Sequence, residues 1–590
     1  MTARLHADAR MLGAIAVVVV IFGFVAQRDA GLSQAGTYVA IFAPAAIGLS
    51  ILLGNVNQIS VGQAGFFGIG AYSVGYLTVD RGWSFWVAAP VGIVLATAIG
   101  IGLGLIALRF RGHYLAMATL AFGLIAAGVF HAAPFLGHAS GITGIAYPQA
   151  GPLTISGHAA YWFAWSVAFG AAVLSLNLLR GRTGRAFEAI RNDELAAEAI
   201  GIPTRRYKIL AFAYSGALAA AGGATFAAFL GLVNPDAVGI ALSVDFLLMV
   251  VLGGGGLVSG ALFGAALIGY LNVVGHQYDN WREVGYGAVV VLCVTFAPGG
   301  VLGTLRRFAF AGARSVRSAP RTVVTPRTAP AAVRVRPAEP LAVRGVTKRF
   351  GGLVALDDVS FVLRPATLTS LIGPNGAGKT TLFNAICGIG GVTSGRIAVA
   401  GVDVTGWQAH RVAALGVGRT FQNARLFAEM TVFENVVAAA TDNGRVTFAS
   451  DLLATPGSRR AEREAAERAR AIIARLRLEH LADVFAKDLA FGDRRRVEVA
   501  RALASDPWLL LVDEPAAGLN QDERERLNDD LLALRDAGTT LLLIEHDMKL
   551  VMAISQRVIV MEFGRVIADG DPASVRNDPR VIAAYLGTAT

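Results

Sequence analysis

Cysteine and charge are both scarce in this sequence. Only 2 of its 590 residues are cysteines, Cys293 within an apolar run and Cys387 shortly after a glycine-rich loop. Their spacing fits neither a metal site nor a disulfide framework, so we expect both to be packing residues. Charged residues make up 16% of the chain and apolar residues 54%. That composition excludes a purely soluble protein.

The scarcity of charge is confined to one half of the chain. Long apolar runs fill residues 11–305, whereas charged residues are frequent from Arg306 onward. The net charge of +10 is also local, because residues 306–340 hold eight arginines and one acid, Glu339. This Pro- and Ala-rich stretch does not alternate its arginines with aromatic side chains, so we expect a tether near an anionic membrane and no nucleic-acid partner. We therefore predict a membrane domain over residues 1–308, a linker over 309–340 and a water-soluble domain over 341–590.

The first part predicts a polytopic α-helical membrane domain with about 8–10 spans, since about 18 apolar residues suffice to cross a bilayer. The expected spans are Met11–Ala26, Tyr38–Gly54, Gly62–Val79, Phe85–Leu108, Tyr114–His131, Tyr161–Leu179, Ile209–Gly231, Gly239–Leu252, Leu257–Val274 and Tyr286–Leu302. We expect the first to be a retained helix and not a signal peptide, because more spans follow at once and no cleavage site is evident. The short Gly239–Leu252 run is also compatible with a half-helix.

Basic residues predict the orientation of these spans. With ten spans, Arg4, Arg10, Arg109 and Arg111, the segment 180–208 and Arg306 all fall on one side. By the positive-inside rule this side is cytoplasmic, and so are both ends of the given chain.

The cytoplasmic segment 180–208 has its own pattern. One helical stripe is formed by Phe187, Ile190, Leu195, Ala199 and Ile200, with Gly201 as a stop, which predicts one short amphipathic helix. Seven basic and four acidic residues in this segment favour docking on a protein over docking on anionic lipid.

Polar residues within the membrane half are candidates for a substrate path. The most polar cluster lies beside an early span and consists of Asn55, Asn57, Gln58, Ser60 and Gln63. The glycines around such segments either allow close helix packing or break helices along a path. Asp245 lies within a span and is either a functional acid or a structurally paired one.

A glycine-rich loop in the second half predicts a phosphate-binding site. It consists of Gly373, Pro374, Asn375, Gly376, Ala377, Gly378, Lys379, Thr380 and Thr381. An apolar strand candidate precedes it, 368–372, and a helical run follows, 382–387. Backbone N–H groups in such a loop close on phosphates, a lysine adds charge, and the threonine hydroxyl can bind Mg²⁺. We therefore expect ATP and Mg²⁺ as cofactors, with Lys379 and Thr380 in these roles.

Other positions in the alternating strands and helices from Leu341 onward match the needs of a nucleotide-hydrolysing α/β domain. An apolar strand ends in Asp513, a candidate Mg²⁺ ligand, and Glu514, a candidate general base. His546 follows another apolar strand and could contact the γ-phosphate; Gln422 could bind Mg²⁺ or water; Phe350 could stack on adenine. Each signal is weak alone, and their order and spacing together strengthen the prediction.

Together these motifs resemble those of ATP-binding-cassette (ABC) transporters. The resemblance rests on the phosphate loop, Gln422, the signature region Leu489-Ala490-Phe491-Gly492-Asp493-Arg494-Arg495-Arg496, Asp513/Glu514, Ala517-Gly518-Leu519-Asn520 and His546. More narrowly, the second half is similar to the branched-chain amino acid import ATPase through Gly418-Arg419-Thr420-Phe421-Gln422, Ile544-Glu545-His546-Asp547-Met548-Lys549 and Ala584-Tyr585-Leu586-Gly587. The first half is similar to the permease of that system through Phe67-Gly68-Ile69-Gly70-Ala71-Tyr72, Arg111-Gly112-His113-Tyr114-Leu115-Ala116 and the 184–202 segment.

The resemblance implies an α/β P-loop ABC ATPase fused behind its permease, which hydrolyses ATP and imports branched-chain or related small hydrophobic amino acids. It implies a bacterial inner membrane location with a cytoplasmic ATPase, a periplasmic solute-binding protein, and a second permease and ATPase, or a second copy of this chain. It also implies that Gly492 contacts ATP held by the opposing ATPase, and that the 184–202 segment is a coupling helix docking near Gln422.

The sequence departs from the family at three positions. Ala490 replaces the signature serine, Phe491 replaces a glycine, and Asn520 replaces an aspartate. Several alternatives remain open at this point. They are an importer of amides, urea or aromatic acids, an exporter, a membrane-anchored ATPase that acts on nucleic acid, and a membrane sensor.

Overall fold

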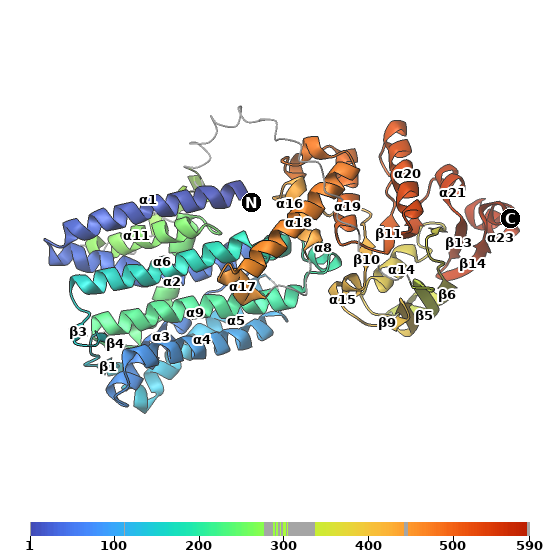
Figure 1. The fold of residues 1–590 in the computed structure, drawn as a ribbon. Coiled ribbons are helices and arrows are strands. Elements are labelled where there is room, and N and C mark those ends of the chain that lie inside the picture. Colours follow the sequence, from blue (N-terminus) through green and yellow to red (C-terminus); the bar gives the residue numbers. More distant parts are fainter. Residues whose placement is uncertain are drawn as a thin grey trace. The chain divides into compact units, whose positions relative to one another are not determined.

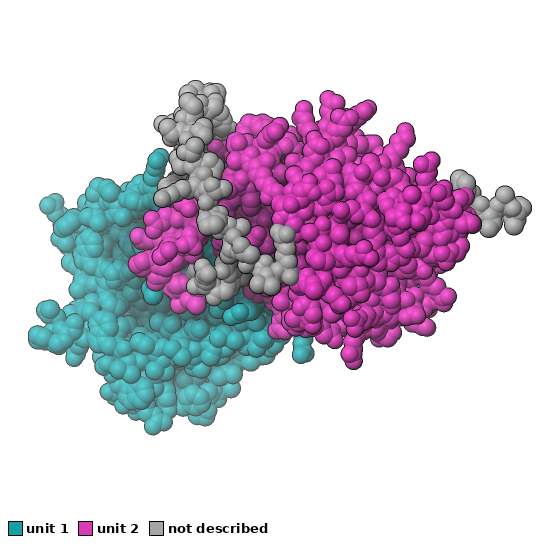
Figure 2. Space-filling model, turned by 45° about the vertical axis from the view of Figure 1, so that its right-hand side comes forward, with its two compact units in different colours: residues 1–187, 205–322, 451–454 teal, residues 188–204, 323–450, 455–590 magenta. Residues whose placement is uncertain are grey.

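The computed structural model describes residues 2–110, 112–275, 287–288, 291–292, 295–296, 299–302, 304, 337–441 and 447–586. The chain forms two compact units, shown in two colours in Figure 2. Unit 1 contains residues 1–187, 205–322 and 451–454, and unit 2 contains residues 188–204, 323–450 and 455–590. Each unit thus includes a short segment from the other half of the sequence.

Unit 1 is a bundle of long apolar helices (Figure 1). Its helices are α1 (Thr2–Ala26), α2 (Ala30–Val56), α3 (Gln63–Val79), α4 (Phe85–Ala107), α5 (His113–Ala132), α6 (His158–Arg180), α9 (Thr204–Leu230), α10 (Ile240–Gly253) and α11 (Val258–Gly275). Short strands pair in the connections, β1 (Ile142–Thr143) with β4 (Leu232–Val233) and β2 (Gln149–Ala150) with β3 (Leu153–Thr154).

Each of the first nine expected spans coincides with a helix, apart from residues at its ends. Within the described residues, 7 helices are long and apolar enough to cross a membrane, and 258–271 is a shorter apolar helix. The helix α3 has only 17 residues. Seven of the 17 residues of the expected span Tyr286–Leu302, including Tyr286 itself, lie outside the described residues. The membrane character of the first half is confirmed, and the total of 8–10 spans stays a prediction.

Small residues bring several of these helices into backbone contact. A Cβ on Gly70 of α3 would lie 2.1 Å from the carbonyl oxygen of Ala220 on α9, and a Cβ on Gly223 would lie 1.9 Å from that of Phe67. Only glycine fits at such separations. At these positions the glycines serve close helix packing.

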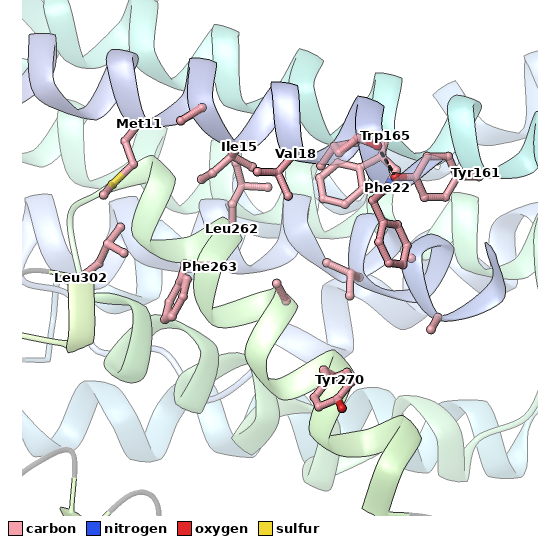
Figure 3. A pocket seen from close by; sticks show the side chains of 16 residues that line it. Met11, Ile15, Val18, Phe22, Tyr161, Trp165, Leu262, Phe263, Tyr270 and Leu302 are labelled. Carbon is pink, nitrogen blue, oxygen red and sulfur yellow. Dashed lines mark hydrogen bonds between the residues drawn. The ribbon is translucent and has the colours of Figure 1, made fainter. Parts of the chain in front are cut away.

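An apolar cavity of about 430 Å³ lies among α1, α2, α6 and α11 (Figure 3). Its wall includes Val18, Phe22, Trp165 and Phe263. Tyr161 also lines it, but its hydroxyl donates to the Val19 carbonyl oxygen at 2.7 Å. The cavity therefore offers almost no polar group to a ligand.

The segment predicted as one amphipathic helix is two helices, α7 (Arg182–Asn192) and α8 (Glu194–Ala199). The prediction of a single helix is wrong because Asp193 has an extended backbone and caps α8, with its side chain accepting a bond from the Ala196 N–H at 2.9 Å. Phe187 and Ile190 are buried as the stripe predicted, and Gly201 follows the end of α8 with a φ of 88°.

Unit 2 contains two sheets. The larger has the order β10-β11-β12-β7-β13-β14 and is parallel except for the antiparallel edge strand β14. Its strands are β7 (Leu368–Ile372), β10 (Val417–Arg419), β11 (Leu509–Asp513), β12 (Thr540–Ile544), β13 (Arg557–Glu562) and β14 (Arg565–Gly570). The antiparallel sheet has the order β6-β5-β8-β9, with β5 (Leu341–Phe350), β6 (Leu353–Val362), β8 (Ser394–Val399) and β9 (Val402–Asp403).

The helices that follow β7 in unit 2 pack against its sheets or against one another. They are α14 (Lys379–Ile386), α15 (Ala409–Ala414), α16 (Val432–Ala440), α18 (Pro456–Arg475), α19 (Phe491–Ala504), α20 (Gln521–Asp536), α21 (Met548–Ile554), α22 (Pro572–Arg576) and α23 (Pro579–Leu586). Every residue of the central strands β7, β11 and β12 is buried. These apolar strands form the core that positions the loops at their carboxyl ends. The short helix α17 (Phe448–Leu452) carries Asp451 into unit 1.

Candidate nucleotide-binding site

Four neighbouring parallel strands end at the same edge of the larger sheet. Gln422 follows β10, the pair Asp513 and Glu514 ends β11, His546 follows β12, and the glycine-rich loop from Gly373 follows β7. In open parallel sheets, ligands bind outside the carboxyl ends of the strands. Residues that lie up to about 170 positions apart in sequence are thus brought to one edge.

The glycine-rich loop requires glycine at both of its ends. Gly373 has a φ of 150°, and a Cβ there would lie 2.1 Å from the Met561 carbonyl oxygen. Gly378, just before α14, has a φ of 94°, and its Cβ would lie 2.4 Å from the Ala355 carbonyl oxygen. The loop therefore passes close to two neighbouring backbones and turns directly into a helix N-terminus, which is the geometry that binds phosphate.

Lys379 lies folded against this loop. Its ammonium donates to the carbonyl oxygens of Gly373 at 2.7 Å and Pro374 at 2.9 Å. Burial lowers the pKa of Lys379, and the carboxylates of Glu514 and Asp513 act in the opposite direction. Thr380 follows on the first turn of α14 and is exposed. A charge and a hydroxyl are thus held at the loop, as the sequence predicts.

The structure brings Glu514, His546 and Gln422 together. Glu514 Oε1 lies 2.6 Å from His546 Nε2, and Gln422 Nε2 donates to Glu514 Oε2 at 3.2 Å. Glu514 has a φ of 45°, which is unusual for a residue with a side chain, and its N–H donates to the Ile544 carbonyl oxygen at 2.9 Å. Three side chains from three strand ends therefore form one hydrogen-bonded group at the sheet edge.

Asp513 offers two carboxylate oxygens suited to a cation. The residue is 1% exposed, and neither oxygen has a hydrogen-bond partner among the described residues. Burial raises the pKa of Asp513 to about 6, while the Arg419 guanidinium, 3.9 Å away, acts to lower it. A buried carboxylate without hydrogen bonds is costly unless a cation or a bound water compensates it. This donor chemistry fits Mg²⁺.

Aromatic residues lie at two other points of the domain. Phe350 ends β5 and is 56% exposed, with the Lys348 ammonium 5.0 Å from its ring centroid, so its stacking on adenine stays a prediction. Tyr585 of α23 was not predicted as a site residue. Burial raises the pKa of Tyr585, and the backbone N–H of Gly373 acts to lower it, so this ring reaches the glycine-rich loop. The only sequence signal for Tyr585 is the closing motif of the family.

The signature region forms the start of α19. Its N-cap residue is Ala490, which makes no side-chain cap hydrogen bond, so the first N–H groups of the helix are available to an anion. Phe491 is 52% exposed, and a Cβ on Gly518 would lie 2.8 Å from its ring. A Cβ on Gly492 would lie 2.4 Å from a Glu523 carboxylate oxygen. Phe491 therefore packs over the loop that follows Glu514.

Asn520, one of the departures from the family pattern, is the N-cap of α20. Its side chain accepts a bond from the Glu523 N–H at 2.9 Å, and Glu523 accepts from the Asn520 N–H at 3.0 Å. Asparagine and aspartate cap helices about equally well. The exchange of the usual aspartate for Asn520 therefore preserves this capping box.

A buried ionic cluster that the sequence reasoning missed joins the signature helix to the Gln422 loop. Arg495 donates to the carbonyl oxygens of Phe421, at 2.7 Å, and of Gln422. Glu498 accepts from the Phe421 N–H at 3.0 Å and lies 3.5 Å from Arg495. Arg501 donates to the Arg425 carbonyl oxygen at 2.5 Å. The sequence shows these residues as charges on an amphipathic helix, and their burial depends on the tertiary fold.

Residues 188–204 lie in unit 2 together with the ATPase residues. Asp193 Oδ2 lies 2.9 Å from Arg425 Nη1, and Asn192 Oδ1 accepts from the Glu429 N–H at 3.1 Å. Arg425 and Glu429 follow Gln422 closely in sequence. The break between α7 and α8 therefore contacts the loop that carries Gln422, which is the docking that the resemblance implied.

Three family models match parts of both halves of the chain. The model "Branched-chain amino acid transport system / permease component" matches residues 31–296, "ABC transporter" matches 356–517, and "Branched-chain amino acid ATP-binding cassette transporter" matches 565–590. Among curated relatives, the high-affinity branched-chain amino acid transport ATP-binding protein LivG of Salmonella typhimurium is 48% identical over 250 residues, covering 42% of this chain and 98% of LivG. The chain belongs to the branched-chain amino acid family of ABC transporters.

Other members and neighbours match the same part of this ABC transporter chain. BraF of Pseudomonas aeruginosa, also a branched-chain amino acid transport ATP-binding protein, is 46% identical over 42% of this chain and 98% of BraF. The lipopolysaccharide export system ATP-binding protein LptB of Haemophilus influenzae is 33% identical over 42% of this chain and 97% of LptB. A crystal structure of a nucleotide-free ATP-binding cassette matches with a TM-score of 0.38 and 33% identity, over 42% of this chain and 99% of its own.

Proposed function

We propose that this chain uses ATP hydrolysis to import branched-chain amino acids, or related small hydrophobic ones, across the bacterial inner membrane. The ATPase half alone does not decide the direction of transport, because it is similar both to LivG and to the exporter ATPase LptB. The permease family model over residues 31–296 favours import of branched-chain amino acids. Amides, urea, aromatic acids and an exported solute are therefore weaker alternatives.

The hydrogen-bonded group of Glu514, His546 and Gln422 carries the proposal of hydrolysis. The Glu514 carboxylate has one oxygen 2.6 Å from His546 Nε2 and the other 3.2 Å from Gln422 Nε2. These bonds hold it at the sheet edge where the glycine-rich loop begins. Glu514 would accept a proton from the attacking water, His546 would orient Glu514 and contact the γ-phosphate, and Lys379 would bind phosphate oxygens.

Three residues would hold Mg²⁺ at this site, namely Thr380, Gln422 and Asp513. The fit rests on the two buried oxygens of Asp513, which have no hydrogen-bond partner among the described residues, and on the exposed Thr380. When bound, the ion would neutralise charge on the β- and γ-phosphates. Phe350 would stack on the adenine.

The exposed start of α19 supports a partner ATPase. Its uncapped N-terminus and Gly492 present backbone N–H groups that suit the phosphates of a nucleotide held by another domain. We therefore propose that a second ATPase and permease, or a second copy of this chain, completes the transporter. A periplasmic solute-binding protein would deliver the amino acid, and the ATPase would lie in the cytoplasm.

Residues 188–204 would carry the conformational change to the membrane half. They bond to Arg425 and Glu429, and the buried Arg495–Glu498 pair ties this same loop to the signature helix. Closure of two ATPases on ATP would move the signature helix and, through this cluster, the α7–α8 break.

Uptake of a panel of solutes tests the proposed substrate. The complete assembly, reconstituted in vesicles with ATP on the ATPase side, is expected to take up labelled leucine, isoleucine and valine. Unlabelled amides, urea and benzoate are expected not to compete. Competition by one of these, with no uptake of the three amino acids, would replace the proposed solute by the competitor.

A further inference from the structure

A large apolar ring lies at the surface of unit 2 where the signature helix begins. It belongs to Phe491, the first residue of α19, which is 52% exposed. The stabilisation that burial gives an aromatic side chain scales with the apolar area removed from water, so a half-exposed ring gains only part of it. Fold stability therefore gives only a partial reason for an aromatic residue where the family pattern has a glycine.

The Phe491 ring lies directly against the loop that follows Glu514. A Cβ on Gly518 would lie 2.8 Å from Cε1 of this ring, and Gly518 has a φ of 75°. Only glycine fits under the ring with this backbone conformation. One residue earlier in the loop, the Ala517 N–H donates to the Glu514 carbonyl oxygen at 3.3 Å. The ring therefore packs on a short loop that is bonded back to the backbone of the proposed general base.

The same ring contacts a side chain that reaches Gln422. The Arg495 guanidinium lies 5.6 Å from the centroid of the Phe491 ring, within the range of a cation–π interaction. Arg495 is buried and donates to the carbonyl oxygens of Phe421, at 2.7 Å, and of Gln422. Gln422 Nε2 in turn donates to Glu514 Oε2 at 3.2 Å. A second route of contacts therefore runs from the ring through Arg495 and Gln422 to the Glu514 carboxylate.

The backbone beside the ring is the part of α19 that we propose to face the nucleotide of the second ATPase. Its first N–H groups have no side-chain cap, because the N-cap residue is Ala490. A Cβ on Gly492 would lie 2.4 Å from a Glu523 carboxylate oxygen, so this turn also rests on the first turn of α20. A nucleotide that shifts or fixes the start of α19 would thus act on the ring and on the loop beneath it together.

We infer that Phe491 is a positioning residue that makes hydrolysis at Glu514 depend on the ATP held by the second ATPase. ATP bound at the start of α19 fixes the ring. The ring then holds Gly518 and Arg495, and these hold the backbone and the carboxylate of Glu514 where it accepts a proton from water. This inference rests on the proposed function, because it takes the second ATPase and the general base from it.

ATP hydrolysis by the complete assembly, measured over a range of ATP concentrations, tests the role of the ring. Phe491→Ala removes the ring and is expected to lower kcat by about fivefold to tenfold while the KM for ATP stays the same. The parent should respond cooperatively to ATP, and Phe491→Ala should lose this cooperativity. Phe491→Tyr keeps the ring and should retain most of the parental kcat. Melting temperatures of the variants check that each one is folded.

A double-mutant cycle with Gly518 isolates the contact itself. Gly518→Ala places a Cβ against the ring and also strains the backbone, so it should lower kcat in the parent. When Phe491→Ala has removed the ring, only the backbone strain remains, and the loss caused by Gly518→Ala should be smaller by about threefold or more. Gly538→Ala is the matched control, because Gly538 follows α20 with a φ of 88°. Its effect on kcat should be the same with and without the ring.

Several results would overturn the inference. A higher KM with an unchanged kcat in Phe491→Ala would make the ring only a part of the contact with the second ATPase. An equal loss of kcat in Phe491→Tyr and Phe491→Ala, or an equal effect of Gly518→Ala with and without the ring, would show that the ring does not hold the loop. Cooperative hydrolysis that persists in Phe491→Ala would overturn this inference alone. No ATP hydrolysis by the parent assembly would overturn the proposed function together with it.

Discussion

At the scale of single residues, the proposed general base for ATP hydrolysis is the Glu514 carboxylate at the sheet edge. Glu514 lies in the left-handed backbone region and is held by His546 and Gln422. Because a carboxylate is needed to accept a proton from water, Glu514→Gln should lower ATP hydrolysis by about 10²-fold or more while ATP still binds. Phosphate release and binding of a fluorescent ATP analogue measure the two effects.

Glu525→Gln is the matched control for this substitution, because Glu525 is exposed on α20. It should hydrolyse ATP at the parental rate. Equal rates for Glu514→Gln and the parent would remove Glu514 from its assigned role as general base.

The pKa of Asp513 predicts a pH-dependent effect on stability in the absence of Mg²⁺. Burial raises this pKa from 3.8 to about 6, so the folded chain binds the proton more tightly than the unfolded chain. The carboxyl therefore destabilises the fold above pH 6, and this contribution disappears as the pH falls from 6 towards 3.8. In EDTA at about pH 7.5, Asp513→Asn should raise the free energy of unfolding by about 1–3 kcal/mol.

Melting temperatures of unit 2, followed at about pH 7.5 and about pH 5, check this sign. The gain from Asp513→Asn should shrink at the lower pH. Because the carboxylate is also an expected Mg²⁺ ligand, Mg²⁺ should stabilise the parent more than the variant. A stability gain that grows as the pH falls would contradict the assigned burial effect.

At the scale of elements, the start of α7 is held by a residue from the ATPase half of the sequence. Asp451 Oδ2 accepts from the Thr183 N–H at 3.0 Å and from its hydroxyl at 2.7 Å, and both residues belong to unit 1. Asp451 is 2% exposed and Thr183 is 1% exposed. Asp451→Ala would leave two buried donors without this acceptor, at a cost of roughly 1–3 kcal/mol.

The melting temperature of the full chain measures this cost. Asp529→Ala, an exposed acid on α20, should leave the melting temperature unchanged, and Thr183→Ser should retain most of the stability because it keeps both donors. A melting temperature for Asp451→Ala equal to that of Asp529→Ala would show that this carboxylate does not hold α7.

How much the sequence predicts differs between elements. The apolar strands β7, β11 and β12 and the glycine-rich loop follow from local pattern, because continuous burial and the strand–loop–helix order are visible in the residues. The break at Asp193 has a local signal too, since aspartate is a strong N-cap, but the apolar stripe on both sides favoured one helix. The Arg495–Glu498–Arg501 cluster has no local signal, because charged residues on a helix usually face solvent.

At the scale of the whole molecule, the two compact units do not coincide with the two halves of the sequence. Residues 188–204 group with the ATPase residues, and residues 451–454 group with the membrane helices. Composition separates an apolar half of the sequence from a charged half. It cannot show which short segments pack with the other half, because that packing depends on tertiary structure. Both exchanged segments carry capping acids, Asp193 and Asp451, which fix helix ends.

The central claim is that ATP hydrolysis by the second half drives amino-acid movement through the first. Leucine accumulation in vesicles that contain the complete assembly, with ATP on the ATPase side, tests it most directly. The parent should concentrate leucine on the ATPase side of the membrane. The Glu514→Gln variant should let leucine reach equal concentrations on both sides at most, or should move no leucine. ATP hydrolysis by the parent without any leucine movement in the complete assembly would contradict the account.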